Sequence, residues 1–173
     1  MSTSQKILVM GMGNDILSDD GIGIRLLRDL QQRIKEPDVE FKEVFESGMQ
    51  VLELMDGYTK AIILDGIKTG HHPPATIYHF TPDNFKDTLH LTSFHNITFR
   101  SSNRIAERLG IKVPVQVHIL AVEIVESELF STKLSHEIEP FYTKIRHDIL
   151  KIIEKLLHNK VVKKEPDSHG NWL

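Results

Sequence analysis

The chain has 173 residues, of which 40% are hydrophobic, enough for one domain with a single core. The net charge of −3 gives no indication of a nucleic-acid partner. The absence of cysteine excludes a cysteine nucleophile, a thiolate metal site and a disulfide. No apolar stretch approaches the roughly 20 residues of a membrane span, and the N-terminal one is too short for a signal peptide. We therefore expect a cytoplasmic protein without membrane contact, and a monomer, because no obligate interface is apparent.

The beginning of the chain predicts a strand followed by a helix. Residues 6–10 (KILVM) form a short apolar run that is typical of a buried strand. A loop rich in glycine and aspartate follows. Apolar residues then recur at helical spacing from Asp20 to Ile34, and Ser18 or Asp19 is expected to cap this helix.

The alternation of strands and helices continues through the next part of the chain. Residues 39–45 alternate between polar and apolar as a strand does, and residues 51–57 indicate a short helix. Residues 60–64 (KAIIL) predict a third apolar strand that ends before Asp65-Gly66. The proline-rich loop at 67–74 contains His71-His72, a pair that we expect to be exposed to solvent.

The second half of the chain predicts two more strands and two more helices. Strands are expected at 76–80 and, after Pro114, up to Ala121, because proline lacks an N–H for the ladder. One helix is expected to end at Leu109, with Gly110 as its C-cap. A long amphipathic helix is expected to continue to Leu157, with Pro140 in its first turn, where proline is tolerated. His118 lies opposite the valine face of its strand and is interpreted as a core histidine.

This order predicts a single α/β domain, with a mostly parallel sheet covered by helices on both faces. The domain is expected to span residues 1–159, and residues 160–173 form a polar, flexible tail. Ligands of such sheets bind beyond the carboxyl ends of the strands. Two places therefore merit attention, namely residues 11–20 after the first strand and Asp65 after the third.

Residues 11–20 have two possible functions. Their glycines suggest a nucleotide-binding loop, but the dinucleotide fingerprint requires a third glycine where Ile16 stands. Asp15, Asp19 and Asp20 would also repel a pyrophosphate at the helix N-terminus. A nucleotide site is thus the weaker alternative, and a site built on carboxylates is the stronger one.

A divalent-metal site is the alternative based on carboxylates. Asp20 begins a helix above the first strand, Asp65 ends another strand, and His95 precedes a helix. Two carboxylates and one imidazole suit zinc, nickel, manganese or iron. Each residue also has a structural interpretation, because an aspartate can cap a helix or turn and a histidine can bond to backbone.

Three motifs in order carry a resemblance to a known family. They are GMGN at 11–14 with DDGIG at 19–23, then IILDG at 62–66, and SFH at 93–95. With them, the chain resembles the hydrogenase maturation endopeptidases, cytoplasmic proteases that trim a C-terminal extension from the large subunit of nickel–iron hydrogenases. The similarity extends from about Lys6 to Leu157.

The resemblance implies a fold, a site and a substrate. The fold would be a five-stranded twisted sheet between helices. The family's metal ligands fall on Asp20, Asp65 and His95, and Asp20 and Asp65 would be the catalytic carboxylates of an aspartyl-type endopeptidase. Its partner would be a large-subunit precursor whose inserted nickel is recognised. The nickel would belong to this substrate, although another divalent metal could occupy the site in the purified protein.

Two alternatives to a protease remain, together with one open question. The protein could be a non-catalytic chaperone that binds the precursor's metal centre, or a nucleotide-binding enzyme that uses Gly11 and Gly13. Arg100, Arg104 and Arg108 form one helical stripe, either a solvated face or a docking strip for the hydrogenase subunit.

Overall fold

The computed structural model describes residues 6–45, 49–81, 106 and 108–159. Within these residues the sheet has five strands, which are β1 (Ile7–Met12), β2 (Val39–Val44), β3 (Lys60–Ile67), β4 (Ile77–Phe80) and β5 (Gln116–Glu123). The helices described in full are α1 (Ile22–Arg33), α2 (Met49–Leu54) and α4 (Tyr142–His158). Two 3-10 turns, η1 (Ser18–Gly21) and η2 (Glu139–Phe141), lead into α1 and α4.

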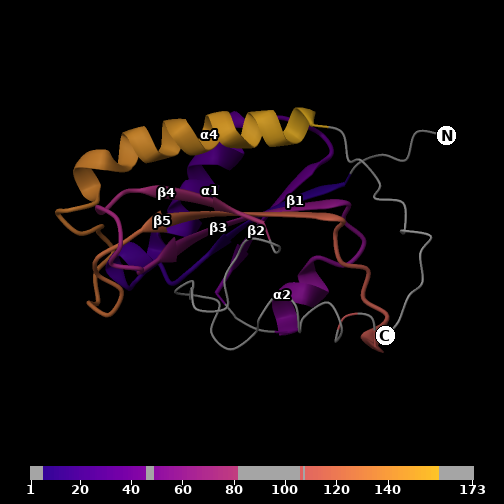
Figure 1. Ribbon diagram of the computed structural model, residues 1–173, viewed down its shortest axis with the longest axis horizontal. Coiled ribbons are helices and arrows are strands. Elements are labelled where there is room, and N and C mark those ends of the chain that lie inside the picture. Colours follow the sequence, from indigo (N-terminus) through magenta and orange to yellow (C-terminus); the bar gives the residue numbers. More distant parts are fainter. Residues whose placement is uncertain (1–5, 46–48, 82–105, 107, 160–173) are drawn as a thin grey trace, which may run out of the picture.

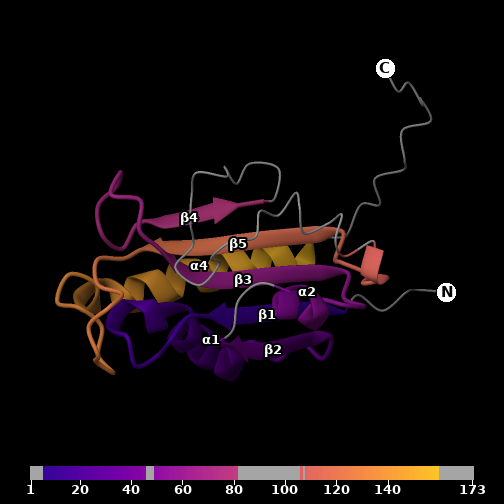
Figure 2. The same ribbon diagram turned by 90° about the horizontal axis from the view of Figure 1, so that it is seen from below.

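The strands form one mostly parallel sheet in the order β2-β1-β3-β5-β4 (Figure 2). β1 pairs in parallel with β2 and β3, and β3 pairs in parallel with β5. β4 is the exception, because it runs antiparallel to β5 at the edge of the sheet. The predicted α/β class and the five-stranded, mostly parallel sheet are thereby confirmed.

Helices cover both faces of the sheet, as predicted (Figure 1). On one face, α1 and α4 bury a cluster that includes Leu27 and Ile149 against Ile62. On the other face, α2 contributes Val51 to a second cluster with Ile63. Since β1 and β3 are buried on both sides, residues 7–10 and 61–64 form apolar runs without alternation, which made these strands recognisable in the sequence.

The order of the strands creates a switch point between β1 and β3. From β1 the chain passes through α1 to β2 on one side, and later enters β3 on the other side. Connections that leave in opposite directions open a crevice at the carboxyl ends of the two strands, where ligands of doubly wound sheets bind. The segment that follows β1 and the end of β3 therefore meet at the carboxyl end of the sheet.

Two details of the sequence prediction need correction. β3 does not end at Leu64, because its parallel partner β5 continues beside it and pairs Asp65 with Ala121 and Ile67 with Glu123. Asp65 consequently lies inside a strand. Ser18 and Asp19 do not cap the helix, because α1 begins after Gly21 and has no side-chain cap bond.

The remaining elements follow the prediction where they are described, except at Pro140. β5 begins at Gln116, after Pro114. Pro140 differs from the prediction, because it lies in the 3-10 turn that precedes α4 and not in the first turn of the helix itself. The helix expected before Gly110 is described only at Ala106 and at 108–109, and the positive φ of 72° at Gly110 fits a C-cap. The tail at 160–173 lies outside the described residues. No helix within the described ranges is both long and apolar enough to cross a membrane.

Candidate active site at the carboxyl end of the sheet

Two glycines bring the turn that carries Asp20 against the ends of β1 and β3. A Cβ on Gly23, in the first turn of α1, would overlap the carbonyl oxygens of Met12 and Leu64. Gly13 has a φ of 129°, and a Cβ there would overlap the carbonyl oxygen of Asp20. Only glycine allows this approach of backbone to backbone. The close packing places η1 beside Leu64, the residue that precedes Asp65.

Asp20 is held by the loop that precedes it. Its side chain is partly buried, and Oδ2 accepts a hydrogen bond of 2.8 Å from the backbone N–H of Asn14. The side chain of Asn14 in turn accepts a bond of 3.2 Å from the N–H of Ile16, which closes a short turn. The Gly-Asn motif therefore has a local task, which is to orient the carboxylate of Asp20.

Asp65 is fully buried near the carboxyl end of β3. Alternation along the strand puts it on the α2 face, in line with Ile63 and Ile67. Its Oδ1 accepts a hydrogen bond of 2.8 Å from the N–H of Gly66. Asp65 directly follows Leu64, the residue against which Gly23 of α1 packs.

Asp19 lies next to Asp20 but has a different function. Its carboxylate is fully buried and accepts bonds from the N–H groups of Val125 and Glu126 and from the N–H and hydroxyl of Ser135, at 2.7 to 3.3 Å. It thus fastens the loop after β5 to the turn that carries Asp20. The first acid of the acidic pair is a structural anchor, although not the helix cap that the sequence suggested.

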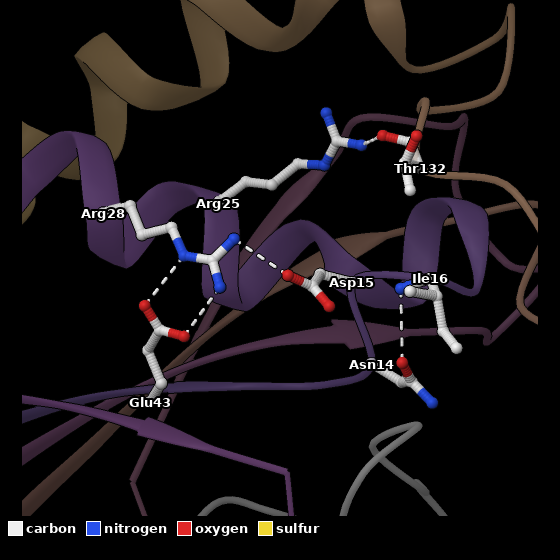
Figure 3. A network of polar contacts seen from close by, with 7 residues as sticks. All are labelled: Asn14, Asp15, Ile16, Arg25, Arg28, Glu43 and Thr132. Carbon is white, nitrogen blue, oxygen red and sulfur yellow. Dashed lines mark hydrogen bonds and ion pairs between the residues drawn. The ribbon is translucent and has the colours of Figure 1, made fainter.

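Two arginines of α1 brace the same loops from outside (Figure 3). Arg28 forms a two-pronged ion pair with Glu43 of β2, with both bonds at 2.7 Å, and reaches Asp15 at 2.8 Å. The bond to Glu43 raises the pKa of Arg28 and lowers that of Glu43. Arg25 donates to the carbonyl of Thr132 in the loop after β5. The Asp20 turn is therefore supported on both sides.

Glu123 is a further organising residue, which sequence analysis missed. Its buried carboxylate accepts four bonds of 2.6 to 2.8 Å, from the N–H and hydroxyl of Thr69, the N–H of Gly70 and the hydroxyl of Tyr78. Burial alone would raise the pKa of Glu123, but these hydrogen bonds outweigh it and lower the pKa. Glu123 thereby ties the loop after β3 to β4. An acid at the end of an apolar strand was the available signal.

The predicted histidines have different environments. His95, the third predicted ligand, lies outside the described residues, as do Arg100 and Arg104. His71 and His72 are exposed, as expected. His118 is partly buried and lies on the α4 face of the sheet. Among the residues that the structure describes, no three His, Cys, Asp or Glu side chains gather into a metal site.

The carboxyl end of the sheet therefore carries two aspartates, Asp20 on the turn after β1 and Asp65 near the end of β3. Carboxylate oxygens can bind a divalent cation or accept a proton from an attacking water. The glycines of the preceding loop are not arranged around a free anion-binding space, because the space at Gly13 is filled by the backbone of Asp20. This arrangement favours acid-based chemistry over phosphate binding.

Comparison with known proteins identifies the family. A family model described as hydrogenase maturation protease matches residues 24–152. The chain belongs to the hydrogenase maturation protease family. The matched region contains Asp65 and His95, and Asp20 lies four residues before its start.

Individual members of the family show the extent of the likeness. The chain is 38% identical to the Hydrogenase 2 maturation protease of Escherichia coli over 73 residues, 42% of this chain and 44% of the relative. It is 28% identical to the hydrogenase expression/formation protein HupD of Thiocapsa roseopersicina over 80% of this chain and 63% of the relative. The matches therefore span less than two thirds of these curated relatives.

Solved structures show the same fold at lower sequence identity. The hydrogenase maturating endopeptidase HybD from E. coli superimposes with a TM-score of 0.68 at 24% identity, over 88% of this chain and 94% of that one. HybD from Thermococcus kodakarensis superimposes with a TM-score of 0.65 at 21% identity, over 88% and 99%. The α/β architecture of this family member is thereby confirmed.

Proposed function

We propose that this protein is a cytoplasmic, monomeric endopeptidase that removes the C-terminal extension of a nickel–iron hydrogenase large-subunit precursor after nickel insertion. The main support is the packing of Gly23 against Leu64, in a chain of the hydrogenase maturation protease family. This packing brings the turn of Asp20 to the strand end that carries Asp65.

The proposed roles follow from the chemistry of the side chains. Asp20, Asp65 and His95 contact the nickel of the precursor, which is part of the substrate, and so position the peptide bond that is cut. Two carboxylates and one imidazole suit a borderline cation such as nickel. A carboxylate of the same site accepts the proton of the attacking water. A precursor without nickel is refused because the three ligands then have little to bind.

The decisive test is an intact-mass assay of the precursor. Purified protein is mixed with a nickel-loaded large-subunit precursor and, in parallel, with the same precursor without nickel. We expect a C-terminal peptide to be lost only from the loaded precursor. Binding of the loaded precursor without a change of mass would contradict the proposal and favour a chaperone.

Substitutions at the site then test its residues. Asp20→Ala, Asp65→Ala and His95→Ala should each abolish processing while the protein stays folded, as judged by circular dichroism. Asp148→Ala, on the exposed side of α4, is a matched control and should process normally. Retained cleavage in any two of the three site variants would refute the assignment.

A further inference from the structure

Two histidines outside the candidate active site form a close pair. His79 is on β4 and His118 is on β5. Nε2 of His79 lies 3.1 Å from Nδ1 of His118, and the ring centroids are 5.2 Å apart with a tilt of 52°. The pair is open to solvent, because His79 is exposed and His118 is only partly buried.

The strand register accounts for the closeness of the two rings. His79 pairs with Leu120, so His118 is its diagonal neighbour on the adjacent antiparallel strand. Diagonal neighbours on one face are within reach of long side chains. His118 also pairs with Ile62, which belongs to the cluster under α1 and α4. The histidines therefore lie on the opposite face of the sheet from Asp65, and the pair is separate from the candidate active site.

We propose that His79 and His118 form a second cation site, which takes a late first-row divalent metal that prefers imidazole, such as zinc. Zinc binds imidazole nitrogen at about 2.0–2.1 Å, so two bound nitrogens lie about 2.9 Å apart at a right angle and about 3.3 Å apart at the tetrahedral angle. The observed separation of 3.1 Å lies between these values. The two strands thus hold the nitrogens at the spacing of a chelate.

The protonation of the pair suits a metal ligand. Burial lowers the pKa of His79, and burial together with the charges of His79 and Lys60 lowers that of His118 to about 4. Both rings are therefore neutral at pH 7, the form that binds metals. When a metal enters, the N–H between the rings moves to the far nitrogen of its own ring. Both facing nitrogens then present lone pairs, and no net proton is released.

Lys60 is the charged neighbour that a cation would encounter. Its ammonium donates to the backbone carbonyls of Leu156 and Asn159, near the C-terminal end of α4. These carbonyls hold the ammonium at the helix end, where a positive charge is favourable.

Because no third His, Cys, Asp or Glu joins the pair among the described residues, the other coordination positions are left to water or to a ligand from another molecule.

The test is a calorimetric titration of the full-length protein with zinc chloride. We expect a binding event in which His79→Gln and His118→Gln each weaken affinity by about 100-fold, because the second ligand of a chelate binds intramolecularly. The double variant His71→Gln/His72→Gln is the matched control, since it removes two exposed histidines of a neighbouring loop and should bind as the original does. Asp65→Asn should also keep the event, which separates this site from the proposed active site.

Nuclear magnetic resonance of the unmodified protein decides the matter even if a variant fails to fold. Zinc should shift the ring nitrogen signals of His79 and His118 together. The proposal would be overturned if either single variant kept full affinity for zinc, or if the Asp65→Asn variant showed no zinc binding. It would also be overturned if zinc shifted only the signals of other histidines. A pair held only by its own hydrogen bond would give these results.

Discussion

Asp19 and Asp20 are neighbours in the chain, yet they belong to two different regions of the molecule. Asp19 belongs to the scaffold, where it is fully buried and accepts four bonds from the loop after β5. Asp20, the proposed site residue, is partly buried, and its carboxylate is oriented by the N–H of Asn14. Glu123 repeats the pattern of Asp19 for the loop after β3.

The difference lies in how the acceptor capacity of each carboxylate is used. A buried carboxylate that accepts four hydrogen bonds has its acceptor sites occupied by the protein itself, so few are left for a ligand. A carboxylate fixed by one backbone N–H keeps an oxygen that can face a cation or a water. Structural acids thus rigidify the loops, and the proposed site acid, Asp20, would depend on that rigidity. Substitutions should therefore separate stability from activity.

The largest expected effect is the loss of activity at Asp20. Asp20→Ala should lower the rate of precursor processing by about 1000-fold or more, about 4 kcal/mol of transition-state free energy. Its free energy of unfolding should change by less than about 1 kcal/mol, because one hydrogen bond to a partly buried group is lost. A processing time course and urea unfolding measure the two quantities. An Asp20→Ala variant that is strongly destabilised but still processes the precursor would contradict this assignment of roles to Asp19 and Asp20.

Asp19→Ala should show the opposite balance. Four donors lose their acceptor in a buried position, so we expect the free energy of unfolding to fall by about 3 kcal/mol. Urea unfolding monitored by circular dichroism gives this value, with Asp20→Ala as the matched variant. Equal destabilisation by the two substitutions would show that the neighbouring acids do not divide their roles as described.

Glu123 should make the scaffold sensitive to acid. The pKa of Glu123 is lowered in the folded state from its ordinary value of 4.5. Ionised Glu123 therefore stabilises the folded protein at pH values above 4.5, and this contribution is lost as the pH falls through the folded pKa. Glu123→Gln should cost about 1–2 kcal/mol at pH 7. The difference should shrink below pH 4.5. Unfolding measured from pH 7 down to pH 3, with the exposed Glu53→Gln as control, tests this; a difference that does not depend on pH would contradict it.

The sequence predicted the strands and helices better than the long-range hydrogen bonds that fasten the loops between them. Strands β1 and β3 were evident because each contains an apolar run that is buried on both faces of the sheet. The order of the elements also placed Asp20 and Asp65 at the same end of the sheet. The role of Asp19 was not predictable, because its donors are more than 100 residues away in the chain. Local patterns report periodicity and caps, but they do not report which distant backbone a side chain meets.

The smallest expected effect concerns the outer brace at Arg28. Its ion pairs with Glu43 and Asp15 are well formed, but its side chain is 45% exposed, so solvent screens them. Arg28→Met should therefore lower the free energy of unfolding by only about 0.5 kcal/mol. Most of this difference should vanish in 1 M salt, where the Debye length is about 3 Å. Lys144→Met, which removes an exposed pair with Asp148 on α4, is a control remote from the site.

The rate of precursor processing should distinguish the surface ion pairs of Arg28 from the buried hydrogen bonds of Asp19. In Arg28→Met the packing of Gly23 on Leu64 and the bond from Asn14 to Asp20 both persist, so cleavage should stay close to that of the unmodified protein. Asp19→Ala releases the loop after β5 and should slow cleavage even at temperatures where it remains folded. If Arg28→Met slowed cleavage as much as Asp19→Ala did, the orientation of Asp20 would depend on the surface ion pairs and not on the buried scaffold.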